Sequence, residues 1–107
     1  MSRPPRERDI ERHLVERVKA IGGEVRKVQW VGRRGAPDRC VMLPARRLSP
    51  SLDCAWCNPS GRVLWVELKA PGQKPEPHQA REHARMRAMG QTVLVIDSFE
   101  GVEEMLR

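Results

Sequence analysis

Residues 35–43, GAPDRCVML, and residues 63–72, VLWVELKAPG, decide how this sequence is read. Each contains a short apolar run that is typical of a β-strand. The first run nevertheless begins at Asp38, and the second carries Glu67 and Lys69 near its middle. Ionised side chains in such runs are costly to desolvate unless they are paired or used. The two stretches therefore indicate a functional site as well as a sheet.

Strand alternation explains how these charges can meet. Glu67 and Lys69 lie on the same face of their strand, roughly 6.5–7 Å apart, while Leu64, Val66 and Leu68 face the other way. If the two strands pair, Asp38 approaches the same place, and Glu11 can arrive from a helix packed over the sheet. Clustered carboxylates repel one another unless a cation holds them, and Mg²⁺ prefers oxygen ligands. The arrangement predicts metal-dependent phosphodiester hydrolysis, with Lys69 acting on the attacking water.

The rest of the chain predicts an α/β sandwich around a mixed sheet, in the order α-β-β-β-α-β-α. Residues 1–6 are expected to form a flexible basic arm, and apolar residues at helical spacing predict a helix over 9–21. Residues 44–61 are rich in Pro, Ser and Asn and predict a long excursion. The nearly all-apolar strand 92–98 is expected at the centre of the sheet. The other strands are expected over 24–31, 37–43 and 62–70, and the other helices over 78–89 and 99–106.

Acidic residues of the first helix differ in where they point. On a helical wheel, Glu11 lies at the edge of the apolar stripe, whereas Glu16 faces solvent. Glu7 shares the side of Glu11 but is expected at or before the start of the helix. Glu11 is therefore the acid of this helix that we expect at the site.

Composition restricts the classes of partner and of location. With 107 residues, the chain is expected to form a single domain over 1–107. Its formal net charge of +6 favours a polyanionic partner, most commonly nucleic acid. No apolar run approaches the ~20 residues that span a bilayer. The N-terminus also lacks a hydrophobic signal region, so the sequence predicts a cytoplasmic protein.

Cysteines offer a different reading. Cys54 and Cys57 form a C-x-x-C pair inside the excursion, which is half of a zinc site. Without further ligands close by, the pair is more simply read as ordinary loop residues. A small interaction protein built around a zinc clip stays open as an alternative.

Taken together, the runs GRRGAPDRCVML (32–43) and WVELKAPGQKPEPHQAREHARMRAMGQTVLVIDS (65–98) resemble the VRR-NUC (virus-type replication-repair nuclease) domain. That domain belongs to the PD-(D/E)xK nuclease superfamily. The resemblance covers nearly the whole chain and implies a restriction-endonuclease-like fold. Residues 44–61 depart from the pattern, because they are longer than the expected turn between the two catalytic strands.

Individual site residues follow from this resemblance. It implies that Mg²⁺ or Mn²⁺ is held by the carboxylates of Asp38 and Glu67 and by the backbone carbonyl of Leu68. It also implies that Lys69 is the catalytic lysine. Two further matches, the acid of the first helix and the glutamine opening the helix after the catalytic strand, are Glu11 and Gln79. Glu11 is expected at a second metal or a metal-bound water, and Gln79 at the water or a phosphate.

Family resemblance also implies a substrate. Stand-alone members from phages and bacteria are similar in acting as homodimers that cut branched DNA. The implied function is therefore a DNA endonuclease that resolves four-way (Holliday) junctions as a homodimer. Two alternatives stay open: a flap- or nick-directed nuclease of the same fold, and a DNA-binding module without catalysis.

Basic residues around the predicted site are candidates for phosphate contacts. Arg33 and Arg34 precede Asp38 in a glycine-containing loop, and Lys74 lies in the turn after the catalytic strand. Arg81 and Arg85 lie one helical turn apart on the following helix. Such contacts position DNA without reading its sequence.

For three large side chains near the site, the sequence predicts a structural role. His78 and His83 are expected at the surface or boundary, because a lysine and a metal leave no need for a catalytic histidine. Trp65 is expected in the core or in the wall of the site.

Overall fold

The structure of the protein is a computed structural model, and it describes residues 3–45 and 61–107. Most of the excursion 44–61, including Cys54 and Cys57, lies outside the described residues, as does the start of the basic arm. The elements are α1 (Glu7–Ala20), β1 (Glu24–Lys27), β2 (Arg39–Leu43), β3 (Arg62–Leu68), α2 (Pro77–Ala88), β4 (Val93–Ile96) and α3 (Phe99–Met105). Their order is the predicted α-β-β-β-α-β-α.

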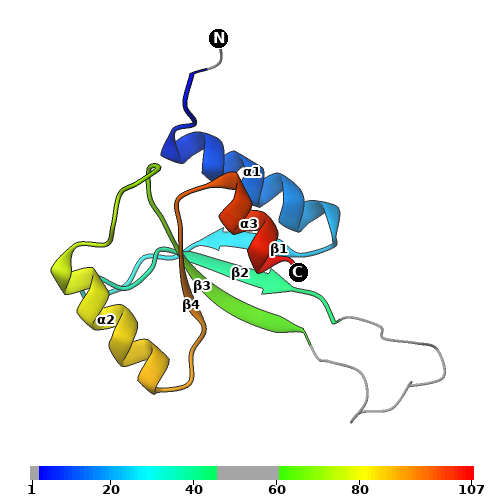
Figure 1. Cartoon of the computed structure of the whole chain (residues 1–107). Helices are drawn as coiled ribbons and strands as arrows, with labels where there is room; N and C mark the ends of the chain where they lie inside the picture. Colours follow the sequence, from blue (N-terminus) through cyan, green and yellow to red (C-terminus); the bar gives the residue numbers. More distant parts are fainter. Residues whose placement is uncertain (1–2, 46–60) are drawn as a thin grey trace.

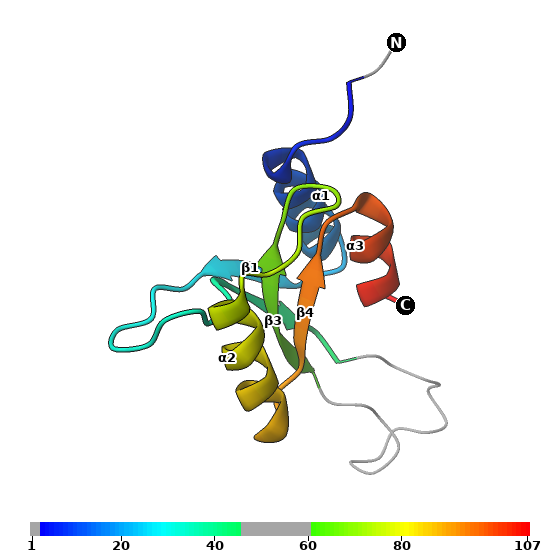
Figure 2. The same ribbon diagram turned by 60° about the vertical axis from the view of Figure 1, so that its left-hand side comes forward.

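A 4-stranded mixed sheet forms the middle layer, with the strand order β1-β2-β3-β4. The pairs β1–β2 and β2–β3 are antiparallel, and β3–β4 is parallel. Helices α1 and α3 lie on one side of the sheet and α2 lies on the other (Figures 1 and 2). The predicted sandwich around a mixed sheet is therefore confirmed.

The main core lies between the sheet and the pair α1 and α3. Helix α1 contributes three fully buried residues to it, Ile10, Leu14 and Val18. The inward residues of β3 are Leu64, Val66 and Leu68, as strand alternation predicted. Outside the core, Glu103 of α3 accepts hydrogen bonds from Arg17 of α1 at 2.9 Å and contacts His13 at 2.9 Å.

The predicted central position of strand 92–98 was wrong. β4 (Val93–Ile96) is an edge strand that follows β3 in the sheet. Val93 and Ile96 are buried because helices cover both faces, so an edge strand here carries an all-apolar sequence. An apolar run in the sequence indicates that both faces of the strand are covered. It does not indicate whether the strand has one or two neighbouring strands in the sheet.

Several element boundaries also differ from the prediction. Helix α1 begins at Glu7, two residues early, because the Asp9 carboxylate accepts a hydrogen bond from the Arg6 backbone N–H at 2.8 Å. Strand β1 ends at Lys27 instead of residue 31, and β2 begins after Asp38. Glu7 therefore lies inside the helix, where its side chain has a defined direction. Within the described ranges, no helix is long and apolar enough to cross a membrane.

Candidate active site

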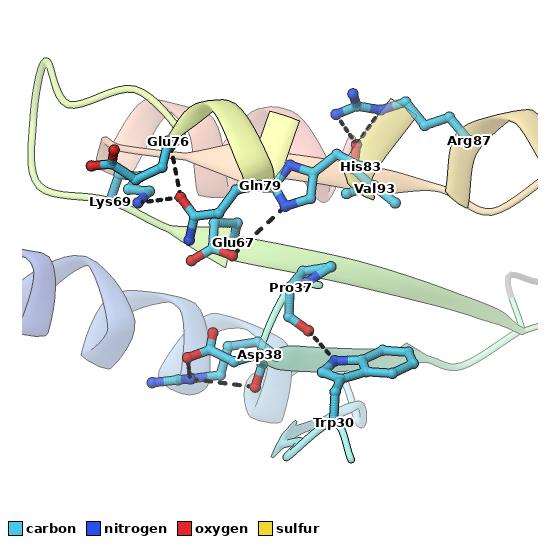
Figure 3. Close-up of polar contacts among 11 residues, drawn as sticks. Trp30, Pro37, Asp38, Glu67, Lys69, Glu76, Gln79, His83, Arg87 and Val93 are labelled. Atoms are coloured by element: carbon cyan, nitrogen blue, oxygen red, sulfur yellow. Dashed lines mark hydrogen bonds and ion pairs between the residues drawn. The ribbon is translucent and has the colours of Figure 1, made fainter. Parts of the chain in front are cut away.

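Residues at the end of β3 and the start of α2 meet on the sheet face that α2 covers. The Nζ of Lys69 donates a hydrogen bond to Oε1 of Gln79 at 2.8 Å (Figure 3). The same oxygen accepts the backbone N–H of Glu76 at 2.8 Å, which caps the first turn of α2. The structure thus brings the predicted Lys69 and Gln79 together, and it fixes the glutamine by a helix cap.

Glu67 is the buried acid of this face, with 8% of its surface exposed. Burial, followed by the charge of Asp38, raises the pKa of Glu67 from 4.5 to about 7; Lys69 opposes this rise. Glu7 raises the Glu67 pKa further, and Arg39 lowers it. The electrostatic coupling indicates that the predicted pair Asp38 and Glu67 faces one region.

Arg39 is a residue that the sequence reasoning missed. Its side chain is 8% exposed, and its guanidinium pairs with Oδ2 of Asp38 at 2.9 Å and with Oε2 of Glu11 at 3.0 Å. Glu11 therefore reaches Asp38 through this arginine. Glu7, one turn earlier, is the acid of α1 whose charge acts on Glu67. The signal for Glu7 was its place on the same side of the helix as Glu11.

Metal-binding capacity depends on the two carboxylates. Within residues 3–45 and 61–107, no three side chains of the His, Cys, Asp or Glu type form a ready metal cluster. Mg²⁺ is commonly held by one or two protein carboxylates, with waters and substrate phosphates completing its shell. Asp38, half exposed, and Glu67, buried and destabilised by the Asp38 charge, fit that pattern. Leu68 is buried next to Glu67, and the metal-binding role of its carbonyl stays a prediction.

His83 is buried, so its expected position at the surface or boundary was wrong. Its ring lies between α2 and the sheet with 1% exposure, and its Nε2 is 3.7 Å from Oε1 of Glu67 (Figure 3). Burial, followed by the charges of Arg87 and Lys69, lowers the pKa of the ring. The sequence analysis missed the buried face of α2 because arginines lie on both sides of it in the sequence. The pattern that could have revealed this face is the helical spacing of His83 and Met86.

Predicted phosphate contacts gather in one place. Four of them, Arg33, Arg34, Arg81 and Arg85, line an open cleft of about 310 Å³ between the loop before β2 and helix α2. We call this the arginine cleft. Glu82 pairs with Arg33 at 3.2 Å and with Arg85 at 3.7 Å, so it holds two of these side chains. Lys74 is exposed in the turn before α2 and is not among the residues that line the cleft.

An apolar groove adjoins the arginine cleft. Trp30 and Trp65 contact each other with a centroid distance of 5.2 Å and a tilt of 53° between their rings, and they line the groove with Met86 and Met89. Trp65 is half-buried, and its Nε1–H donates to Oε1 of Gln91 at 2.9 Å. Trp65 is therefore part of a wall beside the cleft.

Comparisons with known proteins agree with this geometry. No family model matches the chain. The sequence is 47% identical over 93 residues to "Putative nuclease p44" of Acyrthosiphon pisum secondary endosymbiont phage 1, covering 87% of this chain and 84% of the phage protein. A solved structure described as "VRR_NUC domain" matches with a TM-score of 0.71 and 37% identity, covering 94% of this chain and 92% of that one. The chain belongs to the VRR-NUC family of nucleases, and its fold is restriction-endonuclease-like.

Proposed function

We propose that this protein is a metal-dependent endonuclease that hydrolyses phosphodiester bonds of branched DNA. The observation that carries the proposal is the buried carboxylate of Glu67, which shares one region with the charges of Asp38 and Lys69. Burial of Glu67, together with the charge of Asp38, raises the pKa of this carboxyl to about 7 and costs stability, and such costs are typical of functional sites. The nuclease relative named above and the family fold support the same reaction class.

The chain's own groups divide the reaction between them. Asp38 and Glu67, with the backbone carbonyl of Leu68, would hold Mg²⁺ or Mn²⁺, which supplies Lewis-acid activation of a phosphate and of a water. Lys69 directs its ammonium group to the phosphate oxygens, where negative charge builds up during attack. Gln79 holds the Lys69 ammonium group, because its oxygen accepts the Nζ–H at 2.8 Å.

The acids of α1 act at the margin of this site. Arg39 pairs with both Asp38 and Glu11 and so offsets part of their negative charge. Because Arg39 brings Glu11 close to Asp38, we assign Glu11 to a second metal or a metal-bound water. Glu7 is a second candidate for that role, because its charge acts on Glu67.

The arginine cleft provides the contact with the DNA backbone. Arginine side chains bind phosphate oxygens in forked geometry and neutralise their charge. Such contacts follow the shape of the backbone and leave the base sequence unread. Lys74, exposed in the turn between Lys69 and α2, is a further candidate for phosphate contact outside the cleft.

Branched DNA and a homodimer are the finer parts of the proposal. A two-fold dimer presents two sites related by symmetry, which matches two symmetric cuts across a four-way junction. The small size and net charge of +6 suit a protein that binds DNA by shape and charge. Flap- or nick-directed cutting by the same site is the alternative substrate choice, and simple DNA binding without cleavage is the non-enzymatic alternative.

One experiment separates these possibilities. Purified protein is incubated with labelled four-way junction, flap, nicked and linear duplex DNA, with Mg²⁺, with Mn²⁺ and with EDTA. Asp38→Asn serves as the test variant and Glu16→Gln, on the solvent side of α1, as the matched control. We expect metal-dependent cutting of the junction by the wild type and by the control, and its loss in Asp38→Asn.

Two results would contradict the proposal. Cutting that persists in EDTA or in Asp38→Asn would remove the metal site from the mechanism. Tight junction binding with no cutting under any condition would leave only a DNA-binding module. Light scattering at micromolar concentration tests the dimer separately, since a monomeric mass would remove the symmetric arrangement.

A further inference from the structure

His83 holds an unusual position for a polar side chain. It is 1% exposed, and within the described part of the chain its Nε2 is the buried side-chain nitrogen or oxygen atom that lacks a hydrogen bond. Buried polar atoms are nearly always paired, so an unpaired one calls for a functional reason. The same atom lies 3.7 Å from Oε1 of Glu67, which places the ring against the proposed metal-binding acid.

The opposite side of the ring contacts the loop before β2. Burial, followed by the charges of Arg87 and Lys69, lowers the pKa of His83, and a hydrogen bond with the backbone of Gly35 opposes this fall. A backbone hydrogen bond that favours the protonated ring is one in which a carbonyl accepts, so the Gly35 carbonyl accepts from the ring. Because Nε2 has no hydrogen-bond partner, this bond belongs to Nδ1. One imidazole therefore lies between Gly35 of the loop and Glu67 of β3.

Gly35 allows the loop to approach helix α2 this closely. Its φ of +87° is in the left-handed region that favours glycine. A Cβ at this position would lie 2.8 Å from the carbonyl oxygen of His78 and 3.2 Å from the Cα of Gln79. The loop backbone consequently rests directly on the first turn of α2, beside the residue that holds the lysine.

The Gly35 contact lies between the two functional ends of the loop. Arg33 and Arg34 stand on one side of Gly35 and line the arginine cleft. Asp38 follows on the other side, after buried Pro37. The Asp38 end is anchored to the strands, because its carbonyl accepts from the Val28 N–H at 2.9 Å. The loop is joined to α2 by the ion pair of Arg33 with Glu82 at 3.2 Å and, at Gly35, by the hydrogen bond from His83.

We propose that His83 is a positioning residue of the active site. Its Nδ1–H fixes the loop of residues 32–37 against α2, and this sets Asp38 relative to Glu67 and Arg33 relative to the arginines of α2. The inference rests on the proposed nuclease function, which it deepens. Partners that orient metal ligands from behind typically contribute 10–100-fold to metal affinity or activity.

Three substitutions separate the two sides of the ring. Asparagine can retain a donor near the Nδ1 position, glutamine reaches toward the Nε2 position, and leucine keeps the volume with neither nitrogen. We expect His83→Asn to keep the loop of residues 32–37 in contact with α2. We expect His83→Gln and His83→Leu to lose this contact. His13→Asn is the matched control, because His13 contacts Glu103 between α1 and α3, away from the site.

Two readouts do not require nuclease activity. Trypsin cuts after Arg33 and Arg34, so release of the loop should raise the rate of cleavage there by at least about tenfold in His83→Gln and His83→Leu. Calorimetry should find Mn²⁺ binding weakened about 10–100-fold in the same two variants. His83→Asn and His13→Asn should stay within about threefold of the wild type in both assays. Thermal unfolding checks that each variant is folded.

Cleavage of junction DNA is then measured on the same proteins. We expect kcat/KM to fall about 10–100-fold in His83→Gln and His83→Leu, and to recover in His83→Asn. If folded His83→Leu matches the wild type in trypsin sensitivity and Mn²⁺ affinity, the positioning role is wrong. Equal losses in all three variants would also overturn it, since the Nδ1 contact would then have no specific part. If the wild type cuts no DNA, the nuclease proposal fails while the trypsin and calorimetry results still decide the role of His83.

Discussion

Replacing Glu67 with glutamine should stabilise the protein above neutral pH while it abolishes DNA cleavage. Burial, and then repulsion by Asp38, raises the pKa of Glu67 from 4.5 to about 7. Between those pH values the native protein keeps a proton that the unfolded chain has released. The stability that this proton contributes is complete below pH 4.5 and is lost as the pH rises through 7.

The size of the effect follows from the same shift. One pKa unit corresponds to about 1.36 kcal/mol, so a rise from 4.5 to about 7 corresponds to about 3 kcal/mol. Glutamine has nearly the shape of glutamate and carries no charge, so it avoids this cost. It also loses the attraction to Lys69, so we expect a gain of about 2–3 kcal/mol above pH 8 and little gain at pH 4. For a domain of this size, a gain of about 2 kcal/mol raises Tm by roughly 8–12 °C.

Urea unfolding in EDTA at pH 4, 6, 8 and 9 measures this difference directly. Glu16→Gln, an exposed acid on the same protein, controls for the general effect of removing a charge. Adding Mg²⁺ or Mn²⁺ at pH 8 should stabilise the wild type more than Glu67→Gln, since the variant keeps only the Asp38 carboxylate of the two that would hold the cation. A gain that does not vary with pH, or a variant less stable than the wild type at pH 8, would refute the reasoning.

Further expectations concern the residues around Glu67. Gln79→Ala should lower kcat about 10–100-fold by freeing Lys69, and it should cost about 1 kcal/mol of stability through loss of the helix cap. Gln79→Glu should keep the cap, so equal stability of the two variants in urea would contradict this expectation. Arg81→Ala should weaken junction binding and reduce the slope of log affinity against log salt by about 1, with kcat unchanged at saturating DNA. An unchanged slope would take Arg81 out of the interface. Gly35→Ala should cost about 1–3 kcal/mol in urea unfolding and lower kcat/KM, because a Cβ meets the α2 backbone; wild-type stability would mean that the loop moves freely away.

The sequence predicted the features that depend on local periodicity. Alternation along residues 62–68 correctly separated the core side of β3 from the side that carries Glu67. The order of elements and the mixed sheet were also confirmed, because helix and strand periods differ clearly in this chain. The roles of Asp38, Glu67 and Lys69 stay predictions, although Asp38 and Lys69 both act on the charge of Glu67.

Features that depend on contacts between distant segments were missed. The sequence gives no sign that Arg39 would be buried between Asp38 and Glu11, since an arginine after an aspartate is usually solvated. His83 lies among arginines along the chain, and only the docking of α2 reveals that it faces the sheet. The edge position of β4 was missed because the apolar pattern records which faces are covered and carries no information on neighbouring strands.

The side-chain oxygen of Gln79 serves two donors, the Glu76 backbone N–H and the Lys69 ammonium. The conformation of the first turn of α2 and the orientation of the Lys69 side chain therefore depend on each other. Duplex DNA that engages Arg81, two residues further along the helix, would pull on the same turn. Binding of the DNA backbone and the orientation of the Lys69 ammonium group are coupled in this way through one helical turn. The coupling requires no hinge and no separate moving segment.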